Sequence, residues 1–282
     1  MNLIQQLLQT SIISSGETLR GRIQDSVIEG KVLENGDISI NKESYDSVEA
    51  AMMSVLGSSR QHLGGSALQF WTWFNPDRNT WVPLEHARAE LESRNKVDEV
   101  KTSLSNPLRI DSVTGYGCIG RIGMTICPGK QGSGLYAGEW KRELETDMKQ
   151  ILDWGGQVLI TLMEKSEFSL LGVSEIGAAS KKSGLIWIHL PIQDMAIPNK
   201  SFEIAWLKKK DWLFGQLQKG VSIVIHCRGG LGRTGMIAAR ILIEMGEDPA
   251  VAITKVRAAR ERAIETYEQE EYLLCKKWEG KT

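Results

Sequence analysis

The chain has 282 residues, of which 41% are hydrophobic and 24% charged, as expected for a globular protein of one large domain or two smaller ones. Its formal net charge of -1 excludes a general electrostatic attraction to nucleic acid or to acidic membranes. Its four cysteines show neither zinc-ligand spacing nor a disulfide framework, so we expect a reducing compartment, with the cytoplasm as the default location.

The first eight residues predict a short amphipathic helix. They lack the basic head and the continuous apolar core of a signal peptide. No apolar run in the sequence approaches the roughly 18 residues that a membrane-spanning helix needs. We therefore expect no membrane segment.

Residues 16–57 show the pattern of a small mixed module. Alternating apolar residues predict three strands, at residues 17–23, 26–33 and 38–40. The Asn35-Gly36 pair favours a tight hairpin between the last two, because both residues accept the positive φ values that such a turn needs. Ser47 is typical of a helix N-cap and predicts a helix over residues 48–56.

The rest of this module is rich in tryptophan. Residues 68–74 predict an aromatic strand, residues 80–82 a closing strand and residues 84–94 a helix. The charged stretch 90–99 indicates the end of the module and a linker. We therefore predict a first domain of residues 1–100 and a second domain of residues 101–282.

Three short motifs of the first domain resemble the small RAMA-type domains found beside restriction and modification systems. They are the hairpin from Gly30 to Ile38, the Tyr45-x-Ser47 helix entry and the Phe70-Trp71-x-Trp73 strand. The resemblance implies a small α+β domain that recognises DNA or modified bases.

The negative charge of the first domain argues against a surface that binds the phosphates of nucleic acid. Residues 1–96 contain 9 Lys and Arg against 12 Asp and Glu, whereas nucleic-acid surfaces are basic. Trp71, Trp73 and Trp81 could stack on a base. In so small a module we expect core packing of these side chains, with a ligand-facing role as the alternative.

The second domain alternates strands with helices. The predicted strands are residues 108–110, 118–126, 158–162, 186–190 and 221–225. The predicted helices are residues 139–154, 170–179, 202–217, 234–244 and 249–260. This order is typical of an α/β domain whose central sheet is mostly parallel and flanked by helices.

The last predicted strand runs into a glycine-rich loop that carries a cysteine and an arginine. Glycines allow successive N–H groups to converge on an anion, and the helix that follows adds the positive end of its dipole. The same field stabilises a thiolate at Cys227, and the planar fork of Arg233 can hold two phosphate oxygens. The alternative is a buried cysteine beside an ordinary turn. His226, the glycine pattern and Thr234 together argue against that alternative.

The run His226-Cys227-x-x-Gly-x-x-Arg233-Thr234-Gly235 resembles the phosphate-binding loop of cysteine-dependent tyrosine and dual-specificity phosphatases. The resemblance implies that Cys227 is the nucleophile, that Arg233 stabilises the transferring group and that the Thr234 hydroxyl helps the thiolate leave. It implies a supporting role for His226 and requires no metal or cofactor. The implied phosphate-binding residues are Arg228, Gly229, Gly230, Leu231, Gly232 and Arg233.

Asp194 is the candidate general acid of the first step and the candidate base toward water in the second step. A phosphoester leaving group needs a proton, and a carboxylic acid on a loop can supply it. Asp194 lies 33 residues before Cys227, a placement that resembles the general-acid loop of dual-specificity phosphatases. A turn-forming aspartate is the alternative.

A late segment, Ala263-Ile264-Glu265-Thr266-x-x-Gln269, resembles the loop that orients the hydrolytic water in the kinase-associated phosphatase branch. That branch usually has glutamine where this chain has Glu265, so we assign the role to Gln269. A solvated helix face remains the alternative for this segment, and the Arg257/Arg260 pair could equally lie on a helix surface.

The resemblance to the kinase-associated branch spans roughly residues 102–278 and implies removal of phosphate from a protein threonine. We expect a protein phosphatase that acts on phosphotyrosine, on phosphoserine and phosphothreonine, or on both kinds of residue. The same chemistry on a phosphoinositide or an RNA 5′-triphosphate is the alternative. Phosphoinositide enzymes tend to carry lysines in this loop, whereas Arg228 is the one basic residue among its variable positions. A further alternative is that the first domain binds nucleic acid and localises the phosphatase. A partner is not carried over, because surfaces outside the motif decide substrate choice.

Overall fold

The computed structural model describes residues 1–23, 26–56, 66–76, 80–94, 100–133, 139–276 and 278. The chain divides into two compact units, with the division near residue 98. The second half of the predicted linker, residues 95–99, lies outside the described residues. Across the described ranges, no helix has both the length and the apolar character needed to cross a membrane.

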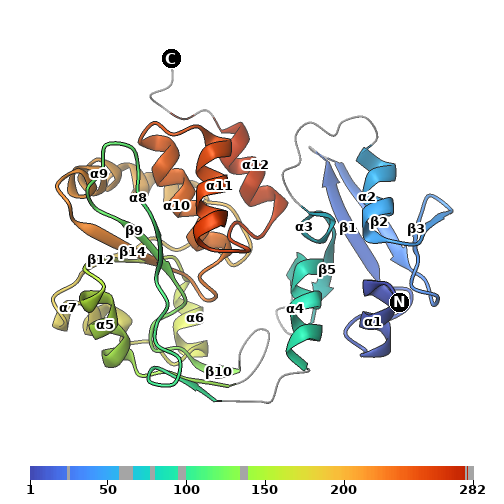
Figure 1. The fold of residues 1–282 in the computed structure, drawn as a ribbon, viewed down its shortest axis with the longest axis horizontal. Coiled ribbons are helices and arrows are strands. Elements are labelled where there is room, and N and C mark those ends of the chain that lie inside the picture. Colours follow the sequence, from blue (N-terminus) through green and yellow to red (C-terminus); the bar gives the residue numbers. More distant parts are fainter. Residues whose placement is uncertain are drawn as a thin grey trace. The chain divides into compact units, whose positions relative to one another are not determined.

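The N-terminal unit is a six-stranded antiparallel sheet with four helices in its described part (Figure 1). The strand order is β4-β3-β2-β1-β5-β6. Its elements are α1 (Leu3–Gln9), β1 (Thr18–Ile23), β2 (Ser26–Val32), β3 (Ile38–Ile40), β4 (Glu43–Tyr45), α2 (Val48–Leu56), α3 (Ala67–Phe70), β5 (Thr72–Asn75), β6 (Thr80–Pro83) and α4 (Leu84–Arg94).

Two of the three tryptophans form the core of this unit, as expected. Trp71 and Trp73 are buried, and Trp71 Nε1 donates a hydrogen bond to the carbonyl of Val48 at 3.0 Å. Trp81 is half-buried, and the guanidinium carbon of Arg20 lies 4.0 Å from its ring centre. Two indoles of the aromatic segment are therefore occupied by packing rather than open to a ligand.

The predicted strand 68–74 is wrong in its first half. Residues 67–70 form α3, and β5 begins only at Thr72. The side chain of Gln69 accepts a hydrogen bond from the Ser66 N–H at 3.3 Å, which caps the helix. An aromatic run has strand propensity, but this cap and tertiary packing override it.

The C-terminal unit is built on a five-stranded sheet of order β13-β12-β14-β9-β8, in which only the edge strand β8 is antiparallel. A small sheet of order β10-β11-β7 accompanies it. The strands are β7 (Lys101–Thr102), β8 (Asp111–Val113), β9 (Ile122–Thr125), β10 (Gln131–Ser133), β11 (Glu139–Lys141), β12 (Gly156–Thr161), β13 (Ile186–His189) and β14 (Ser222–His226).

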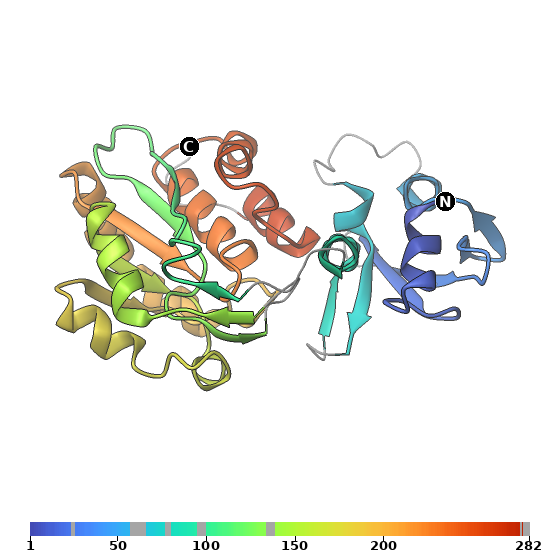
Figure 2. The same cartoon turned by 60° about the horizontal axis from the view of Figure 1, so that its bottom comes forward.

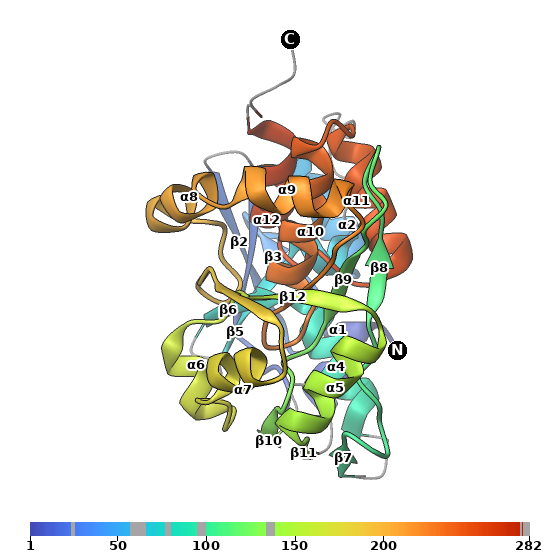
Figure 3. The same cartoon turned by 90° about the vertical axis from the view of Figure 1, so that its left-hand side faces the viewer.

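Helices cover both faces of the five-stranded sheet (Figures 1 and 3). The helices are α5 (Leu144–Asp153), α6 (Lys165–Leu170), α7 (Ile176–Lys182), α8 (Lys200–Leu207), α9 (Lys210–Gln218), α10 (Gly232–Glu244), α11 (Pro249–Ala259) and α12 (Tyr267–Cys275). Helices α5 and α7 contact one side of the sheet, and α9 and α10 contact the other. The last three helices lie against one another (Figure 2). The predicted α/β architecture with a mostly parallel sheet is confirmed.

Strand β14 lies in the middle of this sheet, and all five of its residues are buried. Burial on both faces explains why it reads as a continuous apolar run rather than as an alternating one. It ends at His226, so the glycine-rich loop begins at the carboxyl edge of the sheet, where ligands of such folds bind.

Two predicted elements near the start of the unit are displaced. The strand expected at 108–110 lies at Asp111–Val113, because the Leu108 N–H donates to Gln150 Oε1 at 2.5 Å rather than to a neighbouring strand. The helix expected from residue 139 begins only at Leu144. Residues 139–141 instead pair with β10 and β7 as strand β11.

Two predicted helices are each broken in two. The helix expected at 170–179 is replaced by α6 and α7, with Gly172 at φ 66° between them. The helix expected at 202–217 breaks after Leu207, where the Lys209 N–H bonds back to the carbonyl of Trp206 at 2.8 Å. In both cases the apolar period continues across the break, so the pattern conceals it.

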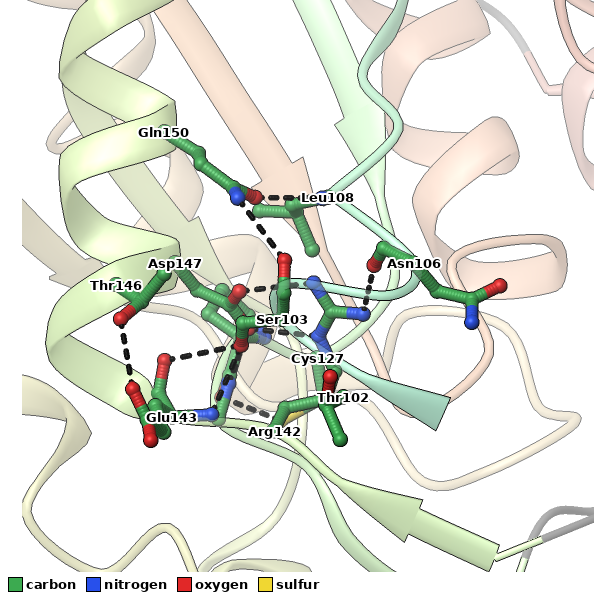
Figure 4. Close-up of polar contacts among 12 residues, drawn as sticks. Thr102, Ser103, Asn106, Leu108, Cys127, Arg142, Glu143, Thr146, Asp147 and Gln150 are labelled. Atoms are coloured by element: carbon green, nitrogen blue, oxygen red, sulfur yellow. Dashed lines mark hydrogen bonds and ion pairs between the residues drawn. The ribbon is translucent and has the colours of Figure 1, made fainter. Parts of the chain in front are cut away.

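A buried ion pair anchors the loop that follows β9 (Figure 4). Arg142 Nε and Nη2 each lie 2.8 Å from the Asp147 carboxylate, and both side chains are almost fully buried. Asp147 also accepts a hydrogen bond from the Gly129 N–H at 2.8 Å, and Arg142 Nη1 donates to the Asn106 carbonyl at 2.6 Å. The first turn of α5 thus holds the carboxyl end of β9 beside that of β14.

Candidate active site

The candidate site is the phosphate loop, residues 226–235, which joins β14 to α10. Gly230 has φ 69°, and a Cβ at this position would lie 2.2 Å from the carbonyl oxygen of Thr125. Only glycine fits here, because the position demands both a left-handed backbone and a close approach to the end of β9. The turn brings the Gly230 N–H within 3.2 Å of Cys227 Sγ.

Cys227 lies directly beyond β14 and is 3% exposed. Its sulfur accepts a backbone hydrogen bond and sits below the amino end of α10, which begins at Gly232. Cys127 follows β9 and is also buried, and burial raises the pKa of its thiol well above the usual value. Of these two buried cysteines, Cys227 is the one in the phosphate loop.

His226 is a neutral imidazole that hydrogen-bonds the chain beside Cys227. Burial lowers its pKa to about 3. His226 Nδ1 lies 3.4 Å from the Cys227 carbonyl oxygen, which can only accept, so Nδ1 carries the proton of the neutral ring. His226 Nε2 therefore accepts from the Thr161 hydroxyl at 2.7 Å, and Trp187 Nε1 donates to the same Thr161 oxygen at 2.9 Å. This network fits the supporting role predicted for His226.

Arg233 is held by the carboxylate of Glu167, a residue that was not predicted from the sequence. Its Nη1 and Nη2 lie 2.7 and 2.8 Å from the two oxygens of Glu167, and Nη1 also donates to the Ile192 carbonyl at 3.0 Å. Burial would lower the pKa of Arg233, but Asp194 and Glu167 raise it above its usual value. The guanidinium is therefore a fixed cation close to Cys227.

Glu167 lies in the first turn of α6, shortly beyond the carboxyl end of β12. It also accepts the Glu164 N–H at 2.8 Å, as part of the helix cap. Its placement after the strand that pairs with β14 is the one signal in the sequence that could have identified it.

Asp194 reaches the phosphate loop. Its Oδ1 lies 2.9 Å from Arg233 Nη2, and its side chain is 29% exposed. The same oxygen accepts the Met195 N–H at 3.1 Å, and Met195 has φ 64°. We name residues 190–198 the acid loop. The left-handed residue beside the carboxylate turns the acid loop toward Arg233.

Gln269 is completely buried, so the solvated helix face considered for this segment is wrong for it. Its Oε1 accepts the Glu265 N–H at 3.0 Å, and its Nε2 donates to the Ala196 carbonyl at 3.4 Å. A Cβ on Gly232 would lie 2.9 Å from Gln269 Oε1, so the amide packs on the phosphate loop. Its predicted role as a water guide stays a prediction.

Two further residues contact the phosphate loop. The Glu265 carboxylate accepts the Gly232 N–H at 2.7 Å. Arg260 Nε donates to the Gly230 carbonyl, and its Nη1 lies 2.7 Å from Asp111 Oδ2. Arg260 is 8% exposed, so a helix-surface role is wrong for it, and it braces the turn at Gly230.

Arg233 Nε and the Thr234 hydroxyl are buried polar atoms of the loop that have no hydrogen-bond partner within the described part of the chain. Buried polar groups are nearly always satisfied, so such atoms suggest a ligand or a reacting group. A tetrahedral oxyanion held above Cys227 offers acceptors to the guanidinium, and a sulfur offers an acceptor to the hydroxyl. The arrangement can take up a phosphoryl group on sulfur.

The comparisons with known proteins agree with this chemistry. Residues 134–247 match a family model described as "Polymorphic toxin system, DSP-PTPase phosphatase". "Cyclin-dependent kinase inhibitor 3" of Rattus norvegicus is 24% identical over 196 residues, which span 68% of this chain and 88% of that protein. The Homo sapiens protein of the same name is 26% identical over 165 residues, 57% of this chain and 74% of that protein.

A solved structure of kinase-associated phosphatase, whose catalytic-site cysteine was replaced by serine, has a TM-score of 0.53 to this chain. Its sequence is 25% identical, and the match covers 60% of this chain and 93% of that chain.

Proposed function

We propose that this chain, a cysteine-dependent protein phosphatase of the dual-specificity class close to the kinase-associated phosphatases, removes phosphate from side chains of phosphoproteins through a cysteinyl-phosphate on Cys227. The observation that carries the residue roles is the 2.9 Å contact between Asp194 and Arg233. It joins a candidate acid to the phosphate loop that contains the buried cysteine.

In the first step, Cys227 Sγ attacks phosphorus and the bond to the ester oxygen breaks. Asp194 gives its proton to that leaving oxygen. Arg233 and the loop N–H groups hold the other phosphate oxygens, which carry the charge of the transition state. The bidentate contact of Glu167 supports this role, because it holds the guanidinium in one orientation before substrate arrives.

In the second step, water attacks the phosphorus of the cysteinyl-phosphate and the sulfur leaves as a thiolate. The Thr234 hydroxyl donates a hydrogen bond to the departing sulfur in this proposal. Its burial without a partner among the described residues supports the assignment. Inorganic phosphate is then released from the loop.

A cavity of about 370 Å³ opens beside Leu231 of the phosphate loop. Its lining includes Trp140 and four arginines, which are Arg109, Arg142, Arg260 and Arg262. Asp111 and Glu261 also line the cavity, so its cations outnumber its carboxylates by four to two. Arg109 is paired with Asp111 at 2.7 Å, and its side chain is mostly exposed. We propose that the cavity receives residues that flank the phosphorylated side chain and that it favours acidic ones.

The proposed compartment is the cytoplasm, because a thiolate nucleophile needs reducing surroundings. The proposed ligand of the N-terminal unit, DNA or a modified base, rests on the RAMA resemblance alone. Burial of Trp71 and Trp73 leaves the half-buried Trp81 as the indole that could contact such a ligand.

The test is a substrate panel with wild type and Cys227→Ser side by side. It contains phosphotyrosine, phosphoserine and phosphothreonine peptides, with and without acidic neighbours, and also a phosphoinositide and an RNA 5′-triphosphate. We expect wild type to release phosphate from peptides, faster from those with acidic neighbours. Cys227→Ser should lose turnover and keep phosphate binding. Activity on lipid or RNA alone would refute the phosphoprotein assignment.

A further inference from the structure

A carboxylate occupies an anion-binding position of the phosphate loop. Glu265 Oε2 accepts the Gly232 N–H at 2.7 Å. Gly232 is the first residue of α10, and the first N–H groups of a helix have no partner within the helix. In a phosphate-binding loop these are the groups that hold phosphate oxygens. The Glu265 carboxylate therefore lies where a phosphate oxygen would be bound.

The segment that presents Glu265 has an unusual backbone. Arg262 has φ 65° and Ile264 has φ 63°. A β-branched side chain rarely adopts the left-handed region, and such strain persists only where surrounding contacts enforce it. Ile264 is completely buried, and Arg257 donates to the carbonyls of Ala263 and Ile264 at 3.2 Å each. The structure thus holds Glu265 in place through contacts on both sides of a strained turn.

The same segment also contacts the acid loop. The Thr266 hydroxyl donates to the Met195 carbonyl at 3.5 Å, and Gln269 Nε2 donates to the Ala196 carbonyl at 3.4 Å. Met195 and Ala196 directly follow Asp194 in the chain. Glu265 is therefore placed between the loop that binds the phosphoryl group and the loop that carries the acid.

The chemical difference between a carboxylate and an amide matters here. The kinase-associated branch that this segment resembles usually has glutamine at the position of Glu265. An amide can orient a water molecule but cannot take its proton at neutral pH, whereas a carboxylate can do both. The Gln269 amide is engaged with the Glu265 N–H and the Ala196 carbonyl, so Gln269 positions the segment.

We propose that Glu265, in place of Asp194, is a catalytic residue of the second step, the general base that takes a proton from the hydrolytic water. This inference rests on the proposed function. A phosphate oxygen takes over the Gly232 N–H when the phosphoryl group fills the loop, which releases the Glu265 carboxylate to the incoming water. The bond from water oxygen to phosphorus forms, the Sγ–P bond breaks, and the water proton passes to Glu265. Cys227 leaves as a thiolate, and Glu265 then returns the proton to solvent.

The test separates the two chemical steps by rapid mixing with an aryl phosphate that has a chromogenic leaving group. Release of that group in the first turnover measures attack by Cys227, and the later steady rate measures hydrolysis of the cysteinyl-phosphate. The variants are Glu265→Gln and Glu265→Ala, with Glu271→Gln on α12 as the matched control. The glutamine of Glu265→Gln keeps an oxygen that can accept from the Gly232 N–H. If Glu265 has only a structural role, this variant should therefore keep its activity, whereas it should lose activity if Glu265 is a base.

We expect an unchanged burst in Glu265→Gln and a steady rate lower on the order of 10²-fold, with accumulation of the cysteinyl-phosphate trapped by denaturation. The control should behave as wild type. A steady rate of Glu265→Gln equal to or above that of wild type would overturn the proposal. Failure of the proposed function looks different, because no cysteinyl-phosphate would then be trapped from any variant, or Cys227→Ser would still turn over.

Discussion

Arg233 Nη2 lies 2.9 Å from Asp194 Oδ1, while Glu167 accepts from both Nη1 and Nη2 of the same guanidinium. The Arg233 guanidinium therefore has two carboxylate partners, the more buried Glu167 and the more exposed Asp194. Asp194 is 29% exposed, against 12% for Glu167. In the proposed mechanism, a phosphate that enters the loop would compete with Asp194 for Arg233 and so free the Asp194 carboxyl to reach the leaving group.

Replacement of Asp194 by asparagine is expected to slow the first step. On peptide substrates, whose leaving groups need a proton, kcat should fall by roughly 10²- to 10⁴-fold. On an aryl phosphate with a strongly acidic phenol the loss should be much smaller, because that oxygen leaves unprotonated. The two substrates are compared at one pH, with Gln193→Ala on the same loop as the control. An equal loss on both substrates would contradict the assignment of Asp194 as the acid.

Substitution of Gly230 by alanine is expected to abolish activity. The new methyl group would meet the Thr125 carbonyl at 2.2 Å, in a backbone that already has φ 69°. Gly184→Ala is the matched control, because Gly184 has φ 89° with open space around its Cβ position. The control should lose only about 1 kcal/mol of stability and keep its activity. Phosphate hydrolysis and thermal unfolding measure the two effects.

The stability of the protein is expected to fall between about pH 6.5 and pH 3 because of His226. Burial lowers the pKa of this imidazole from 6.5 to about 3, so the unfolded chain takes up a proton in this range and the folded protein does not. The stabilisation is complete above pH 6.5, and each pH unit below removes up to roughly 1.4 kcal/mol.

The measurement is urea unfolding of wild type and His226→Asn at several pH values between 7 and 5. The stability advantage of wild type should shrink as the pH falls. Glu203 does not interfere in this range. Burial would raise its pKa, but Arg240 and Lys276 lower it to about 2, so its contribution is lost only below pH 4.5. A pH-independent difference between the two proteins would show that His226 is protonated in the folded state.

The Arg142–Asp147 pair supports a stability prediction. Asp147→Ala leaves the Arg142 cation buried without its carboxylate, which should cost about 3–5 kcal/mol. The double variant Arg142→Met/Asp147→Leu should recover much of this loss, because it removes both charges. Asp153→Ala breaks an exposed pair with Lys149 and should change stability by less than about 1 kcal/mol. Chemical denaturation of the four proteins gives the comparison, and equal losses for Asp147 and Asp153 would contradict it.

Much of the candidate site could be predicted because its signals are local. The buried run of β14, the glycines and the first turn of α10 are contiguous, and one short segment carries the strand, the turn and the helix start. Asp194 was found by its spacing from Cys227, and the structure places it at Arg233. The break between α8 and α9 could not be predicted, because the helical spacing of apolar residues continues through it unchanged.

Glu167 and Glu265 show the limit of sequence reasoning at this site. Each is an ordinary glutamate in a polar stretch, and its partner, Arg233 or Gly232, lies 66 or 33 residues away in the chain. A charged side chain does not reveal which distant group it will meet, because the parallel sheet brings strand ends together regardless of their order in the sequence.

The sequence by itself determined the glycine-rich loop and the α/β class and predicted Cys227 as the nucleophile, because these depend on the backbone preferences of glycine and on patterns of neighbouring residues. Only the tertiary structure decided which carboxylates surround Arg233 and Gly232. Those contacts depend on the pairing of β12 with β14 and on the strained turn at Ile264. Contacts between segments distant in the chain set both the strand pairing and this turn. The backbone preference of isoleucine opposes the left-handed turn at Ile264.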